Sequence, residues 1–198
     1  MSHVNGWASD APTPAQLKEF FAQIQSGRIT KEILQGFLRG RKDFRIWKTV
    51  KLGGFRNTDE VRSALEEARM KIGDYANDIL GKTPLESEES EVNLVVLSVA
   101  ELGFPNGAEY GKICEAAKEL GLELCPAEVG AQLRLQYADQ PIDEWLIIAM
   151  EPIADSDGGL GLFDVVRYGS DLWLNGYYGH SDNFWSGHNR FAFVLPQE

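Results

Sequence analysis

"EWLIIAMEPIADSDGGLGLFDVVRYGSDLWLNGYY", residues 144–178, contains three apolar segments that are separated by glycine-containing turns. Each segment is short and rich in branched and aromatic residues, which is typical of β-strands. Gly158-Gly159 and Tyr168-Gly169-Ser170 suit hairpin connections. A fourth segment of the same kind closes the chain, so strands are predicted at 144–152, 160–166, 171–178 and 190–196. Strands in hairpin order after helices predict an α+β fold with a mainly antiparallel β-sheet.

Helices are predicted ahead of these strands. "TPAQLKEFFAQIQSG", residues 13–27, begins with a capping box of Thr13 and Gln16 and carries one apolar stripe. A second amphipathic helix is predicted at 30–40, and the short turn between the two makes an N-terminal helical hairpin. A longer helix is predicted from Thr58 to Leu80, because apolar residues recur there at three- and four-residue steps. We expect the hairpin and the long helix to pack on the sheet.

The charge of the chain is divided unevenly. Residues 1–56 carry +6 and residues 57–198 carry −17. The acidic segment 82–91, with its Gly and Pro, is the best candidate for a linker between a basic helical section, 1–82, and an acidic β-rich section, 91–198. We expect the two sections to fold as one cooperative unit. The basic part is predicted to contact acidic surface, within the chain, on a protein partner or in a homo-oligomer.

One segment combines basic and aromatic residues as a groove for single-stranded nucleic acid would. The alternative for "RIWKTVKL", residues 45–52, is an edge strand whose lysines discourage pairing with another sheet. We favour the edge strand, because the net charge of −11 repels a polyanion and disfavours nucleic-acid binding. The candidate nucleic-acid residues are Arg39, Arg41, Lys42, Arg45 and Lys48.

The cysteines and the N-terminus point to the cytoplasm. Cys114 and Cys125 are too few for a disulfide framework and form no C-x-x-C pair, so we expect buried free thiols. The first residues lack an apolar stretch of signal-peptide length, and no 18-residue apolar run occurs, so no membrane association is expected.

"YGHSDNFWSGHN", residues 178–189, is predicted to be an exposed loop and the chief ligand-contact surface. Its aromatic residues offer rigid contact area and its short polar residues adapt to a ligand. Two alternatives stay open: the aromatic residues could seal the end of the sheet, or His180, Asp182 and His188 could bind a metal ion. The histidine spacing matches no established metal motif. The contact candidates are Trp173, Tyr177, Tyr178, His180, Asp182, Trp185, His188 and Asn189.

A further group of acids lies in "EPIADSDGGLGLFD", which contains Glu151, Asp155, Asp157 and Asp164. The D-x-D-G run is similar to part of a calcium loop, but the acid and the bidentate glutamate required at the other positions are missing. A β-hairpin turn is therefore the favoured interpretation. The chain also lacks a G-x-S-x-G elbow, a phosphate loop and a dinucleotide fingerprint, so neither catalytic residues nor a cofactor are predicted.

Several segments together resemble an uncharacterised bacterial protein family of environmental and small-genome lineages. They are "TVKLG", "ANDILGK", "ELGF", "LELCPAEVGAQLRLQYADQPIDEWLIIAMEPIADSDGG" and the closing "NRFAFVLP" with its preceding Trp185. The resemblance covers about residues 48–198. The family has no assigned activity, so the resemblance implies no catalytic residue.

The leading hypothesis is a cytoplasmic, non-catalytic binding or protein-interaction module. The first alternative is a metal-dependent hydrolase centred on His180, Asp182 and His188. The second is nucleic-acid binding through the segment from Arg39 to Lys51.

Overall fold

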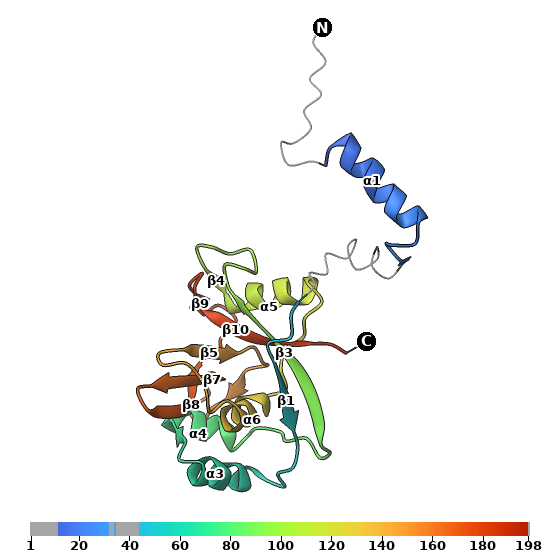
Figure 1. Ribbon diagram of the computed structural model, residues 1–198. Helices are drawn as coiled ribbons and strands as arrows, with labels where there is room; N and C mark the ends of the chain where they lie inside the picture. Colours follow the sequence, from blue (N-terminus) through green and yellow to red (C-terminus); the bar gives the residue numbers. More distant parts are fainter. Residues whose placement is uncertain (1–11, 32–33, 35–43, 198) are drawn as a thin grey trace. The chain divides into compact units, whose positions relative to one another are not determined.

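The computed structural model describes residues 12–31, 34 and 44–197. The chain divides into two compact units, Met1–Lys42 and Asp43–Glu198, which are considered separately (Figure 1). None of the described helices is long and apolar enough to cross a bilayer.

The described part of the first unit is dominated by α1 (Pro14–Gln25). Its predicted capping box is confirmed: the Thr13 N–H donates to Gln16 Oε1 at 2.8 Å, and the Gln16 N–H donates to Thr13 Oγ1 at 3.3 Å. No residue of α1 is buried. Most of the second predicted helix, and Arg39, Arg41 and Lys42 with it, lies outside the described residues.

A β-sheet forms the frame of the second unit (Figure 1). Its strands follow the order β1–β3–β10–β5–β7–β8–β2, and β6 pairs with β7 beside this path. A separate pair, β4 with β9, lies apart from it. The strands are β1 (Lys48–Leu52), β2 (Lys71–Ile72), β3 (Ser90–Ser98), β4 (Ala108–Glu109), β5 (Trp145–Ile148), β6 (Ile153–Ala154), β7 (Leu160–Tyr168), β8 (Asp171–Tyr178), β9 (Phe184–Trp185) and β10 (Arg190–Leu195).

The α+β class is confirmed, but the finer description of the sheet needs correction. The sheet is mixed, because β10 runs parallel to β5 and β2 runs parallel to β8. The hairpin between β7 and β8 is antiparallel as predicted. The final strand does not continue the series at the edge; it inserts between β3 and β5. The acidic segment 82–91 leads from α4 into β3, and β1 before it pairs with β3 after it.

The predicted long helix from Thr58 to Leu80 is wrong. The segment forms α3 (Thr58–Glu67), then β2, then α4 (Asp74–Leu80). Arg69, with φ of 58°, lies in the left-handed region and ends the helical path. The next residues add a strand beside β8, which gives their backbone hydrogen-bond partners in the sheet.

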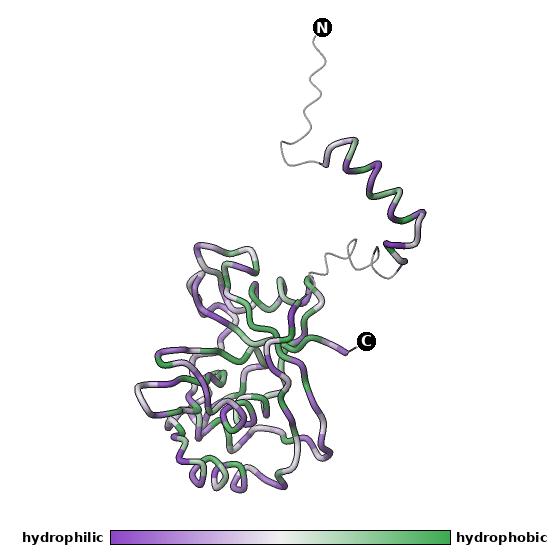
Figure 2. The backbone as a smooth tube through the Cα atoms, viewed as in Figure 1, coloured by the Kyte–Doolittle hydropathy of each residue, from purple (hydrophilic) through white to green (hydrophobic). Residues whose placement is uncertain are grey.

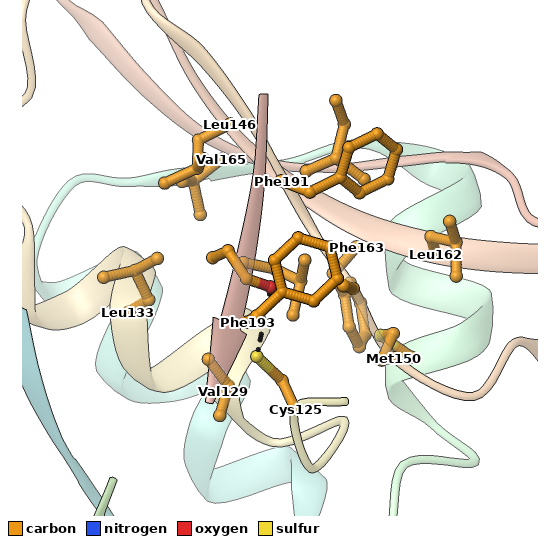
Figure 3. Close-up of a cluster of buried hydrophobic side chains, with 14 of the residues drawn as sticks. Cys125, Val129, Leu133, Leu146, Met150, Leu162, Phe163, Val165, Phe191 and Phe193 are labelled. Atoms are coloured by element: carbon orange, nitrogen blue, oxygen red, sulfur yellow. Dashed lines mark hydrogen bonds between the residues drawn. The ribbon is translucent and has the colours of Figure 1, made fainter. Parts of the chain in front are cut away.

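Helices α4 and α6 (Val129–Gln136) cover one face of the sheet. A Cβ atom on Gly130 of α6 would lie only 2.6 Å from Phe163, so glycine is what permits this close approach. Apolar residues gather along the central strands (Figure 2). Side chains from α6, β5, β7 and β10 meet in the buried cluster of Figure 3.

The open edge of β1 is covered by side chains of α6. The Lys51 N–H donates to Gln136 Oε1 at 3.0 Å, and Gln136 Nε2 donates to the Lys51 carbonyl at 2.8 Å. The Gly53 N–H donates to Glu128 Oε1, and Gln132 Nε2 donates to the Gly53 carbonyl, each at 2.9 Å. These three side chains are spaced by four residues and therefore share one side of the helix. They take the place of a further strand, and β1 is the edge strand that the sequence predicts.

Candidate functional site

The segment 178–189 is mostly loop and partly exposed, as predicted, but it is not open throughout. It contains β9, whose Trp185 pairs with Ala108 of β4. Trp185 is 2% exposed, so its predicted role as an exposed contact residue is wrong. The strand pair turns the indole inward, where its ring lies 5.1 Å from Phe191 and 5.0 Å from Tyr177. Trp185 therefore seals the end of the sheet, which was the alternative interpretation of these aromatic residues.

The polar candidates of this segment are separate from one another. His180, Asp182 and His188 are exposed, and the described residues contain no cluster of His, Cys, Asp and Glu that could hold a metal ion. His188 Nδ1 lies 3.1 Å from Ser186 Oγ. Asn189 is buried, and its Oδ1 accepts from the Ser186 N–H at 2.8 Å. Asn189 thus stabilises a local turn.

Three other aromatic residues are open to solvent. Tyr177 is 41% exposed, whereas Tyr178 and Phe184 are each 62% exposed. The Tyr178 ring lies 6.2 Å from that of Tyr75 in α4. Trp173 is half-buried, and Lys71 Nζ lies 5.1 Å from its ring centroid. These exposed aromatic side chains lie on β8 and β9, and Tyr168 of β7 and Phe21 of α1 are exposed as well.

The register of the central strands places one acid among these aromatic residues. Asp164, in the middle of β7, lies opposite Ile147 of β5 and Asn175 of β8. Directly paired residues project from the same face of a sheet. Asp164 and Asn175 are therefore neighbours on one face, and Asp164 is 1% exposed.

Three further residues share this face by the same register. Trp145 and Trp173 both lie level with Val166, two residues from Asp164 along β7. Tyr177 lies level with Leu162, two residues from Asp164 in the other direction. We call this surface the aromatic face; it consists of Trp145, Trp173, Asn175 and Tyr177. All four side chains are at least partly open to solvent.

The rings of this face close over Asp164. Trp145 on β5 and Tyr177 on β8 lie on opposite sides of Asp164, one level with Val166 and the other with Leu162. Their ring centroids are nevertheless only 5.4 Å apart. Trp185 adds a third ring, 5.8 Å from Trp145 and 5.0 Å from Tyr177. The strand register, these ring contacts and the 1% exposure of Asp164 together indicate that the three rings lie over its carboxyl group, and we call them the three-ring roof.

The carboxyl group of Asp164 is unsatisfied beneath this roof. Neither oxygen has a hydrogen-bond partner among the described residues, and the same is true of Trp185 Nε1. Burial raises the pKa of Asp164 to about 7. Trp145 lies close enough to oppose part of that rise in pKa, although its geometry falls short of a hydrogen bond. With a pKa of about 7, the carboxyl group changes between its neutral and its ionised form within the physiological pH range.

Sequence reasoning missed the importance of Asp164. It was considered only as one of four acids in an incomplete calcium loop. The available signal was a single acid within the apolar strand "LGLFDVV". A charged residue in the middle of a buried strand is rare unless it is paired or functional.

The cysteines and the basic segment give no comparable site. Cys114 and Cys125 are buried free thiols, as predicted, and burial raises the pKa of Cys114 to about 11. The Cys125 thiol donates to the Ala192 carbonyl at 3.3 Å (Figure 3). Of the described basic candidates, Arg45 is exposed, and Lys48 Nζ lies 4.8 Å from the ring of Tyr137.

Comparison with known protein families, with curated proteins and with solved structures finds no match. The resemblance to a bacterial family therefore stays a prediction.

Proposed function

We propose that the protein is a non-catalytic binding module and that the aromatic face is its ligand-contact surface. One observation carries the proposal: several large aromatic side chains lie side by side on one sheet face and remain partly exposed. Aromatic rings lose little conformational entropy on binding and provide a large contact area, which is why they dominate binding surfaces.

The proposed surface differs from the predicted loop in its composition. Tyr177 and Trp173 are retained from the sequence prediction. Tyr178 projects from the opposite face of β8, toward Tyr75 of α4, and is no part of the aromatic face. Trp185 is buried and packs against the rings of Trp145 and Tyr177. Trp145 and Asn175 join it because strand pairing places them there.

The proposal also covers the kind of ligand that the aromatic face binds. The net charge of −11 favours a cationic or neutral ligand over nucleic acid. A protein partner or a homo-oligomer, which was predicted from the uneven division of charge along the chain, stays a prediction. A cytoplasmic location and a bacterial origin stay predictions.

The test is a screen of small molecules and peptides by ligand-observed NMR, followed by competition between the compounds that bind. We expect the binders to compete for one site and to lose affinity when Tyr177→Ala or Trp173→Ala is introduced. Phe21→Ala is the matched control, because Phe21 is likewise 59% exposed and belongs to α1 in the other unit. Binders that are unaffected by both Tyr177→Ala and Trp173→Ala, or that are weakened equally by Phe21→Ala, would contradict the proposal.

A further inference from the structure

Asp164 contributes nothing to the packing that an apolar residue would not contribute better. It is 1% exposed, and both its carboxyl oxygens lack a partner among the described residues. Ionised, the group is a buried charge that only the nearby Trp145 offsets in part; protonated, its O–H has no acceptor among the described residues. Leu162 and Val166, two residues away on the same face, show that apolar side chains fit this strand. A group that destabilises the fold in either state requires another explanation.

The surroundings of Asp164 are suited to a positive charge. The faces of aromatic rings carry negative partial charge and attract cations, most strongly in the case of Trp. Three such rings, those of Trp145, Tyr177 and Trp185, lie within 5.0–5.8 Å of one another over the carboxyl group. Asn175 lies directly opposite Asp164, but its side-chain oxygen lies against Gly73 on the other side of β8, so Asp164 is the acceptor that this site offers.

We infer that Asp164 and the three-ring roof bind a primary alkylammonium group. The inference rests on the proposed binding function and names the chemistry of its ligand. The ammonium group would donate to the carboxyl group of Asp164, and its alkyl chain would lie against the rings. Both a free amine and a lysine side chain of a partner protein carry this group.

An alkylammonium group fits better than a metal ion. Hard cations such as Ca²⁺ require about six or more oxygen ligands, and no suitable cluster is present among the described residues. An ammonium group needs only a few acceptors and gains from apolar contact along its chain.

Tyr177 provides the route to the carboxyl group. It is 41% exposed and lies near the end of β8, so in this proposal a change of its side-chain rotamer gives the ammonium group access to Asp164. The negative charge of the protein also raises the local concentration of cations. For a ligand as small as butylammonium we expect affinity in the millimolar range.

The experiment is a titration of the full chain with butylammonium chloride at constant ionic strength. Binding is read from the indole N–H signals of Trp145 and Trp185 in NMR spectra. Asp164→Asn is the test variant, because it keeps the size of the side chain and removes its charge. Asp182→Asn is the control, because it makes the same change in net charge at an exposed acid of the neighbouring segment.

We expect saturable shifts in the wild type and in Asp182→Asn, and an affinity about tenfold or more lower in Asp164→Asn, as for a lost charge-assisted hydrogen bond. Tetramethylammonium, which has no N–H, should bind more weakly than butylammonium. Nα-acetyl-lysine methylamide separates the sources: tighter binding than butylammonium indicates a lysine side chain, and weaker binding indicates a free amine.

Three results would overturn the inference: no saturable binding in the wild type, equal weakening in both Asn variants, or tighter binding of tetramethylammonium. These results are distinguishable from failure of the proposed function. Compounds from the general screen that depend on Tyr177 but not on Asp164 would leave the contact surface intact and exclude the ammonium site.

Discussion

Replacing Asp164 by Asn should remove a pH-dependent destabilisation of the fold. Burial raises the pKa of this carboxyl from 3.8 to about 7. Below about pH 4 both the folded and the unfolded chain keep the proton, and the group has no effect on the free energy of unfolding. Between about pH 4 and pH 7 the unfolded chain releases the proton while the folded chain retains it. The free energy of unfolding of the wild type therefore falls as the pH rises through this range.

The magnitude follows from the shift in pKa. Each pKa unit corresponds to about 1.4 kcal/mol, so a shift of roughly three units makes the folded state less stable by about 4 kcal/mol at pH 7 than at pH 4. Asn cannot titrate and avoids this loss. Asp78 and Glu60, whose pKa values are lowered mainly by hydrogen bonds, act in the opposite direction. They are present in both proteins, so their effects cancel in the difference.

Urea unfolding, followed by tryptophan fluorescence, measures this difference at intervals from about pH 4 to about pH 8. We expect the advantage of Asp164→Asn over the wild type to grow by about 4 kcal/mol across the range. Asp182→Asn controls for the change in net charge. Parallel stability curves for the wild type and Asp164→Asn would refute the reasoning, because they would show that the folded protein does not hold Asp164 in its neutral form.

Three further predictions concern the fold. Leu65→Ala, at a fully buried position of α3, should lower the free energy of unfolding by about 2–5 kcal/mol in urea titrations; a smaller loss would mean that α3 is peripheral. Gln136→Ala should cost about 1–3 kcal/mol and accelerate hydrogen exchange at the Lys51 amide, and unchanged exchange would contradict the proposed covering of the β1 edge. Gly130→Ala should destabilise by about 1–3 kcal/mol through its clash with Phe163, which a thermal melt at unchanged temperature would exclude.

Local features of the sequence were sufficient for the elements whose signals are local. The capping box of Thr13 and Gln16 predicts the start of α1 correctly. The segment 171–178 forms β8 with the predicted bounds, and the turn at Gly169 joins it to β7. The lysine-rich strand at 48–52 lies at the edge of the sheet, as expected. In each case the residues that decide the outcome are within a few positions of one another.

The candidate site required the tertiary structure, because its residues come from strands that are distant in sequence. Trp145 and Tyr177 are separated by β7, and only the pairing of β5, β7 and β8 brings their rings together over Asp164. The sequence indicated that the aromatic residues near the C-terminus are important. It could not predict which of them face the solvent and which are buried. Trp185 turned inward because β9 pairs with β4, which no local pattern indicates.

The sequence by itself determined the α+β class, the strands β1, β5, β7, β8 and β10 and the buried thiols, since these follow from local periodicity and composition. Only the tertiary structure decided where the apparent helix at 58–80 breaks, because residues 71–72 gain their hydrogen bonds from β8, about a hundred residues away. The same holds for Asp164. An acid in an apolar strand is visible in the sequence, but the pKa of its carboxyl depends on which neighbours remove it from water and fail to pair with it.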